Sequence, residues 1–131
     1  MSSSPPKDQP CSAIGVLLVD DEEGFRRSLA ETLRDDGHPV LDYASPSHIP
    51  DLATLAGVRV LVTDYETPEM NGIRLADEFR ARHPTAAVVV VTACRTRRLD
   101  GEAAHRRDFL QLVEKPLEYG ALHALIHCAA R

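Results

Sequence analysis

Carboxylates follow two apolar segments of the sequence and could together bind a cation. Asp20 and Asp21 come directly after the largely apolar run of residues 14–19. Asp64 follows residues 58–63 in the same way. Each run is typical of a buried parallel strand, and in an open α/β sheet the functional crevice lies at the carboxyl ends of the strands. The three carboxylates are therefore expected to converge on one edge, where their mutual repulsion would favour a hard divalent cation.

The chain as a whole alternates predicted strands and helices. Strands are predicted over residues 14–19, 39–43, 58–63, 86–91 and 109–114. Helices are predicted over residues 21–37, 45–56, 71–83 and 95–107, and a last helix carries Leu122, Leu125, Ile126 and Ala129. Asp21 and Asn71 are expected to cap the first and third of these helices. The alternation predicts an α/β fold: a doubly wound, five-stranded parallel sheet in the flavodoxin-like order 2-1-3-4-5, with helices on both faces.

Size and composition fit one small domain. The 131 residues are 44% hydrophobic, and 15 basic against 20 acidic residues give a net charge of −5, which argues against direct nucleic-acid binding. Residues 1–13 are expected to form a disordered leader, and residues 14–131 the domain itself. No signal peptide or membrane-length apolar run is visible, and three cysteines without metal-site spacing suit reduced thiols in the cytoplasm.

Five landmarks in one order resemble the receiver domain of bacterial response regulators, over about residues 14–130. They are Asp20-Asp21, Asp64, the pair Pro68 and Gly72 that follows it, Thr92 after a run of valines, and Lys115-Pro116 after the last strand. Each landmark alone is weak, since an acidic pair is often only a helix cap and a strand-end Asp only a turn residue. Their common order and spacing carry the resemblance.

The resemblance implies a phosphoacceptor. Asp64 would accept a phosphoryl group from the phosphohistidine of a sensor histidine kinase or a histidine phosphotransfer protein. Asp21 and Asp64 would bind Mg²⁺ directly, helped by the backbone carbonyl of Glu66, and Asp20 would act mostly through a water. Phosphoryl transfer depends mainly on positioning and charge neutralisation, which suits such a site.

The resemblance also assigns a switch. Thr92 and Lys115 would contact the phosphoryl oxygens. The family usually has an aromatic residue three positions before the lysine, but this chain has Leu112, so the usual coupled movement is in doubt. Glu66 and Cys94 occupy positions that tune the phosphoryl lifetime in the family, and Cys94 is expected to be a small buried side chain.

Two other features have two interpretations each. His123 and His127 are four residues apart on the last predicted helix, a spacing that suits a metal pair, but no third ligand is evident, which favours a partly solvated face. Residues 95–107 hold five arginines, which could dock an acidic partner or form a solvated and mobile helix. With Leu112 in place of the aromatic, signalling is expected to depend on the ordering of residues 95–107.

The sequence thus predicts a signalling receiver rather than an enzyme in the usual sense. It would switch a surface that binds a protein partner, with no membrane attachment, and the exposed face of the last two elements could mediate a homodimer. One alternative is a pseudo-receiver, which binds proteins without phosphorylation. Another is a small Mg²⁺-dependent phosphatase with an aspartyl nucleophile, although such enzymes have a second Asp where this chain has Glu66.

Overall fold

A parallel sheet of five strands forms the centre of the molecule. The computed structural model describes residues 13–52, 55–67, 69–116 and 118–129, so Pro68 and nearly all of the expected leader lie outside the described residues. The strands are β1 (Gly15–Val19), β2 (Val40–Tyr43), β3 (Val58–Asp64), β4 (Ala87–Thr92) and β5 (Leu110–Glu114). Every pairing is parallel and the order is β2-β1-β3-β4-β5, which confirms the predicted topology.

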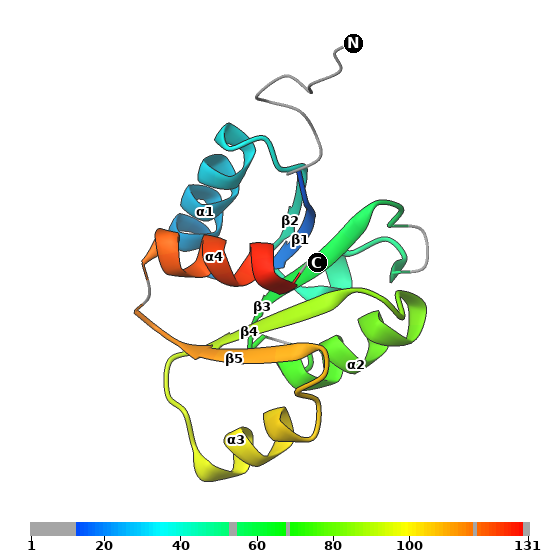
Figure 1. Ribbon diagram of the computed structural model, residues 1–131, viewed down its shortest axis with the longest axis vertical. Helices are drawn as coiled ribbons and strands as arrows, with labels where there is room; N and C mark the ends of the chain where they lie inside the picture. The colour runs from blue at the N-terminus through cyan, green and yellow to red at the C-terminus, as the bar shows by residue number, and fades with distance from the viewer. Residues whose placement is uncertain (1–12, 53–54, 68, 117, 130–131) are drawn as a thin grey trace.

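Helices cover both faces of this sheet (Figure 1). They are α1 (Glu23–Asp35), α2 (Gly72–Arg82), α3 (Arg97–Ala104) and α4 (Tyr119–Ala129). One core cluster joins the sheet to α1 and α4, and the other joins it to α2 and α3. Among the described residues, no helix is both long and apolar enough to span a bilayer.

Strict alternation of side chains along the strands divides the core into these two clusters. In β1, Val16 and Leu18 pack toward α1 and α4, whereas Leu17 and Val19 pack toward α2 and α3. All four side chains are at most 1% exposed, because successive residues of a strand point to opposite faces and both faces are covered. A sheet that is buried on both faces therefore explains the continuous apolar runs in the sequence.

The predicted helix over residues 45–56 is wrong within the described residues. A short 3₁₀ helix, η2 (Pro46–His48), forms at its start in place of an α-helix, and Ser45 caps it by accepting a hydrogen bond from the Ser47 amide. Pro46 suits the first position of a helix, but Pro50 has no amide hydrogen to continue one. The chain leaves the helical conformation after His48, and Ile49 is buried in the core.

The two predicted caps have different outcomes. Asn71 caps α2, since its side chain accepts a hydrogen bond of 2.9 Å from the Arg74 amide. Asp21 does not cap α1: the N-cap residue is Glu22, which makes no side-chain cap bond. The side chain of Asp20 takes that role in part, because its Oδ1 accepts the Glu22 amide at 2.9 Å. The carboxylate of Asp21 is thereby left exposed at the edge of the sheet.

Candidate functional site

The carboxyl ends of β1 and β3 bring three carboxylates together. Asp20 directly follows β1, and Asp64 is the last residue of β3, the neighbouring strand. Oxygens of Asp20, Asp21 and Asp64 all lie within 4.8 Å of one another. Asp20 is buried, Asp64 is half-buried and Asp21 is exposed, so the cluster opens to solvent on one side. The predicted convergence on one sheet edge is confirmed.

A lysine from the end of β5 completes this cluster. The Nζ of Lys115 lies 3.4 Å from Oδ2 of Asp20 and 3.8 Å from Oε1 of Glu22. Its backbone amide donates a 2.7 Å hydrogen bond to the carbonyl of Thr92, which ties the loop to the end of β4. The peptide bond between Lys115 and Pro116 is cis. The lysine therefore reaches the same sheet edge from the opposite end of the strand order.

The site carries more negative than positive charge. The pKa of Asp64 is raised to about 6, chiefly by burial and then by the charges of Asp20 and Asp21, whereas Lys115 opposes the rise. Burial likewise raises the pKa of Asp20 above its ordinary value, although the Glu22 amide and Lys115 favour its charged form. Burial lowers the pKa of Lys115, but Asp20 and Asp64 outweigh that effect and the net direction is upward. One ammonium thus compensates three carboxylates only in part, and a cation would find a favourable potential here.

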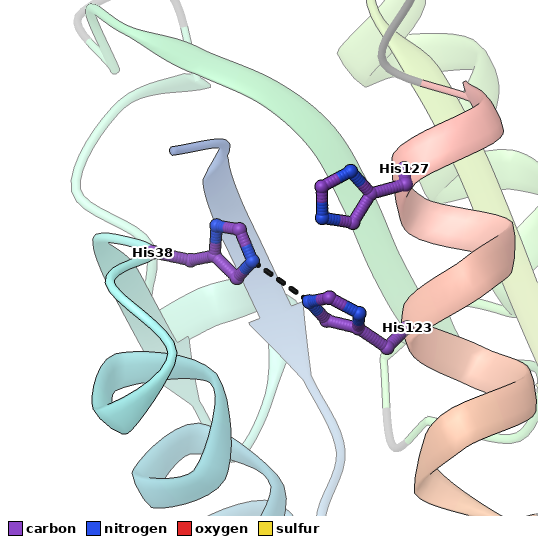
Figure 2. Close-up of side chains that lie close together, drawn as sticks. All are labelled: His38, His123 and His127. Carbon is purple, nitrogen blue, oxygen red and sulfur yellow. Dashed lines mark hydrogen bonds between the residues drawn. The ribbon is translucent and has the colours of Figure 1, made fainter. Parts of the chain in front are cut away.

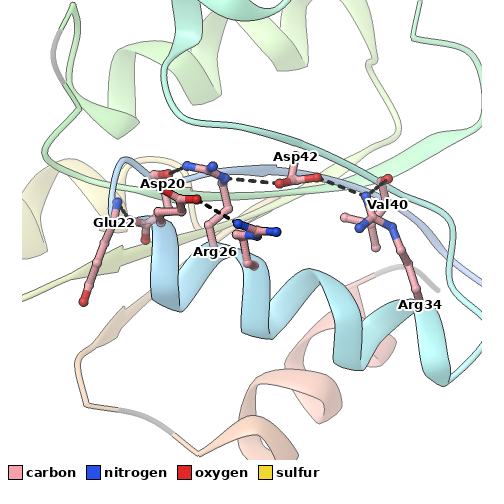
Figure 3. A network of polar contacts seen from close by, with 8 residues as sticks. Asp20, Glu22, Arg26, Arg34, Val40 and Asp42 are labelled. Carbon is pink, nitrogen blue, oxygen red and sulfur yellow. Dashed lines mark hydrogen bonds and ion pairs between the residues drawn. The ribbon is translucent and has the colours of Figure 1, made fainter.

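An arginine on α1 holds the end of β1 in place (Figure 3). Arg26 donates from Nη1 to the carbonyl of Asp20 at 2.9 Å and from Nε to Oδ2 of Asp42 on β2 at 3.1 Å. Arg34, two turns later on α1, donates to Oδ1 of Asp42 at 3.0 Å and to the carbonyl of Val40 at 2.8 Å. This network fixes α1 against β1 and β2, and it was not predicted from the sequence. The spacing of Arg26 and Arg34 on one helix face was the available signal.

The loop between β3 and α2 returns tightly to the strand end. The amide of Gly72 donates to the carbonyl of Tyr65 at 2.7 Å. A Cβ atom on Gly72 would lie 2.7 Å from the carbonyl oxygen of Asp64 and 3.0 Å from Cα of Tyr65, so only glycine fits this approach. Glu66 pairs with Asn71 in an isolated antiparallel bridge, and its side chain is exposed. The backbone of Glu66 is therefore held beside the acidic cluster.

The predicted switch residues Thr92 and Leu112 lie on β4 and β5, the last two strands in the order of the sheet. Thr92 ends β4 and is 2% exposed, and its hydroxyl oxygen accepts the Cys94 amide at 3.3 Å. Cys94 itself is exposed, so the expectation of a small buried side chain is wrong: the chain has left the sheet by that position. Leu112 is buried in β5 among the side chains of the α2 and α3 cluster. An aliphatic residue thus fills the position where the family usually has an aromatic ring.

The arginine-rich segment forms a short, capped helix. Thr96 caps α3 by accepting a hydrogen bond of 3.1 Å from the Leu99 amide. Three of the five arginines in residues 95–107 form ion pairs: Arg95 with Asp100, Arg98 with Glu102, and Arg106 with Asp77. These pairs reduce the positive charge that a docking patch would need.

A second cluster of ligand-type side chains was missed by the sequence analysis. His38 provides the third imidazole beside His123 and His127, with nitrogens of all three within 4.8 Å (Figure 2). His123 and His127 are half-buried, as expected of a partly solvated face, but the expectation that no third ligand accompanies them is wrong. His38 lies in the turn after α1, 85 residues from His123, so only the packing of α1 beside α4 brings them together. A histidine next to the α1 stop at Gly37 was the only signal in the sequence.

Comparison with known proteins agrees with the geometry. The profile of the response regulator receiver domain matches residues 16–127. A response regulator receiver protein of Anaeromyxobacter sp. (strain Fw109-5) is 37% identical over 103 residues, which cover 77% of this chain and 42% of that protein. The transcriptional regulatory protein FixJ of Azorhizobium caulinodans is 30% identical over 119 residues, which cover 89% of this chain and 55% of that protein. The chain thus spans about half the length of these two relatives.

A solved structure supports the fold. It is a response regulator protein from Burkholderia pseudomallei with a phosphorylated aspartic acid, a calcium ion and citrate. It superposes with a TM-score of 0.75 at 20% identity, over 90% of this chain and 66% of that one. With the profile match over residues 16–127, the strand order and the acidic edge of the sheet, this chain belongs to the response regulator receiver domain family, a family of signalling domains.

Proposed function

We propose that Asp64 accepts a phosphoryl group from the phosphohistidine of a sensor histidine kinase or a histidine phosphotransfer protein. The observation that carries the proposal is the meeting of Asp64 with Asp20, Asp21 and Lys115 at one sheet edge. Asp64 is half-buried, so one face of its carboxylate is open to a donor. The Burkholderia pseudomallei relative, whose structure contains a phosphorylated aspartic acid, supports the same chemistry here.

The donor set fits Mg²⁺. The oxygens of Asp20, Asp21 and Asp64 are hard ligands within 4.8 Å of one another, and Mg²⁺ prefers a few carboxylates together with waters. The carbonyl of Glu66 would add one neutral oxygen. The raised pKa of Asp64 reports a carboxylate whose charge is not yet compensated. When bound, the ion would neutralise charge on the acceptor and on the incoming phosphoryl group.

The residues of the chain would divide the work of transfer. An oxygen of Asp64 forms a bond to phosphorus, the P–N bond of the donor histidine breaks, and the imidazole leaves with that electron pair. The ammonium of Lys115 would exchange part of its contact with Asp20 for the new phosphoryl oxygens. The hydroxyl of Thr92 would turn from the Cys94 backbone toward the phosphoryl group. Glu66 and Cys94, both exposed beside the cluster, would set how fast water removes the group.

Transmission to a partner would not use the aromatic residue that is usual in the family. Leu112 lacks a ring, and it is already packed in the core with Leu99 and Ala103 of α3. Movement of Thr92 would therefore reach α3 through the segment that follows β4. We propose that residues 14–131 form the functional receiver domain and that it works in the cytoplasm. Binding experiments would identify the output partner and test for a homodimer.

The test is mass spectrometry of the intact protein after incubation with acetyl phosphate and Mg²⁺. We expect one phosphoryl adduct per chain, lost in hydroxylamine, that requires both Mg²⁺ and Asp64. Asp64→Asn should give no adduct, and the matched control Asp108→Asn, which changes an exposed aspartate, should react like the wild type. An adduct on Asp64→Asn would refute the assignment.

Two other outcomes point to the alternatives. Absence of both the adduct and Mg²⁺ binding would favour a pseudo-receiver. Repeated turnover of a small phosphate ester, rather than modification that stops at one group, would favour a phosphatase.

A further inference from the structure

We propose that His38, His123 and His127 form a binding site for a late first-row divalent cation such as Zn²⁺, separate from the acidic cluster. His38 comes from the turn between α1 and β2, and the other two come from α4 (Figure 2). His123 and His127 are one helical turn apart and therefore share a face of α4. The three rings point toward one another from two elements that are distant in the sequence.

The distances suit coordination. The Nε2 atoms of His38 and His123 are 2.9 Å apart, and the His123 and His127 ring centroids are 4.5 Å apart. Given a Zn–N bond of about 2.0–2.1 Å, two nitrogens of a tetrahedral site lie roughly 3.3 Å apart. Small movements of the rings would bring all three nitrogens to that separation from their present arrangement within 4.8 Å. The fourth position would be left to water.

The chemistry of the cluster selects the class of ion. Three imidazole nitrogens suit Zn²⁺, Ni²⁺ or Cu²⁺, whereas Mg²⁺ prefers oxygen ligands. His38 is 2% exposed, and burial lowers its pKa, as do His123 and His127, which keeps the ring neutral and able to coordinate. The carboxylate Oδ2 of Asp36 lies 3.8 Å from Nε2 of His123 and adds a negative charge beside the ion.

The hydrogen bonds identify what the ion would displace. Nδ1 of His38 accepts the Ile14 amide at 3.0 Å, so the neutral ring carries its proton on Nε2 and donates it to His123. A cation at Nε2 takes the place of that proton, which moves to Nδ1, and the bond from the Ile14 amide then breaks. Coordination would thus replace a hydrogen bond between two imidazoles by a metal bridge from α4 to the turn after α1.

The position separates the two sites. Ile14 precedes β1 and Asp20 follows it, so roughly 20 Å of extended chain lies between the histidine cluster and the acidic cluster. The ion would fasten α4 to the turn after α1, away from the acidic cluster. Zn²⁺ bound there would therefore stabilise the fold without competing for the carboxylates.

The test is a titration of the metal-free full chain with Zn²⁺ against a competing chelator. We expect one ion per chain, a rise of the thermal unfolding temperature, and a shift of the Ile14 amide resonance. His127→Gln should weaken binding at least tenfold, since even the loss of an outer-shell partner costs about 10–100-fold. His127 is half-buried, so this variant should fold; thermal unfolding without metal checks that, and His123→Gln is the second variant.

Three controls make the outcome decisive. His105→Gln changes an exposed histidine, Cys128→Ser removes the thiol next to His127, and Asp64→Asn removes an acidic ligand. All three should bind Zn²⁺ like the wild type. Loss of binding in Cys128→Ser or Asp64→Asn but not in His127→Gln would overturn the proposal, as would the absence of any one-to-one binding. In either case the imidazoles form only a hydrogen-bonded network.

Discussion

The charge of Asp64 should destabilise the protein when Mg²⁺ is absent. Its pKa is raised from 3.8 to about 6, chiefly by burial and then by Asp20. The folded protein therefore binds more protons than the unfolded chain between these two values, and stability falls as the pH rises through that window. A shift of about two units at roughly 1.4 kcal/mol per unit gives an upper limit of about 3 kcal/mol at neutral pH. Asp64→Asn removes the charge while keeping the shape, so we expect it to stabilise the metal-free protein by about 1–3 kcal/mol.

Urea unfolding in EDTA at neutral pH and at acid pH measures this effect. The advantage of Asp64→Asn should shrink to about 1 kcal/mol near pH 4.5, where most of the wild-type Asp64 is protonated in the folded state. Saturating Mg²⁺ should also reduce the advantage, because the ion stabilises the wild type by binding its folded form. Asp108→Asn, at an exposed position, should stay within about 0.5 kcal/mol of the wild type.

A clear result would refute this reasoning. If Asp64→Asn is no more stable than the wild type in EDTA at neutral pH, the carboxylate is not under electrostatic stress. The same conclusion follows if the difference between the two proteins does not change with pH. In that case, other contacts compensate the negative charge of the aspartate cluster, and the raised pKa of Asp64 does not reflect them.

Three further substitutions test the packing and the local signals around the site. Phe79→Ala should destabilise the protein by about 3–5 kcal/mol in urea unfolding, because Phe79 is 0% exposed and its loss leaves a cavity. Asn71→Ala should cost about 1 kcal/mol in the same assay, since it removes the side-chain cap of α2, while Asn71→Asp should retain most of it. Gly72→Ala should cost about 1–3 kcal/mol and weaken Mg²⁺ binding measured by calorimetry, because its Cβ would meet backbone atoms of Asp64 and Tyr65. Equal Mg²⁺ affinity in Gly72→Ala and the wild type would contradict the close approach of this loop to the acceptor.

At the acidic edge, the position of each aspartate at the end of its strand was enough to predict that the side chains meet. Asp20 and Asp64 were predicted to meet because each ends a strand of a parallel sheet, and the order β2-β1-β3-β4-β5 makes those strands neighbours. Lys115 reaches the same edge from β5, although two strands lie between β1 and β5. The contact of its Nζ with Asp20 depends on how the strand ends are arranged in space, which the topology alone does not decide.

Two predictions from local signals in the sequence were wrong. Asp21 had the right position to cap α1, but Asp20 accepts the Glu22 amide and the helix begins one residue later than predicted. The helix expected over residues 45–56 contains Pro46 and Pro50, and the short 3₁₀ helix η2 forms at its start instead, because prolines interrupt the backbone hydrogen bonds of an α-helix.

The sequence by itself determined the strand and helix order, the parallel sheet and the carboxylates at its edge. These follow from periodicity and from the rule that strand ends share an edge, which are local or topological properties. Only the tertiary structure decided the bond from Arg26 to the Asp20 carbonyl and the meeting of His38 with His123. Both depend on how α1 packs against β1 and α4, and the physical reason is that side-chain contacts between distant segments are set by packing distances and rotamers, which no spacing in the sequence records.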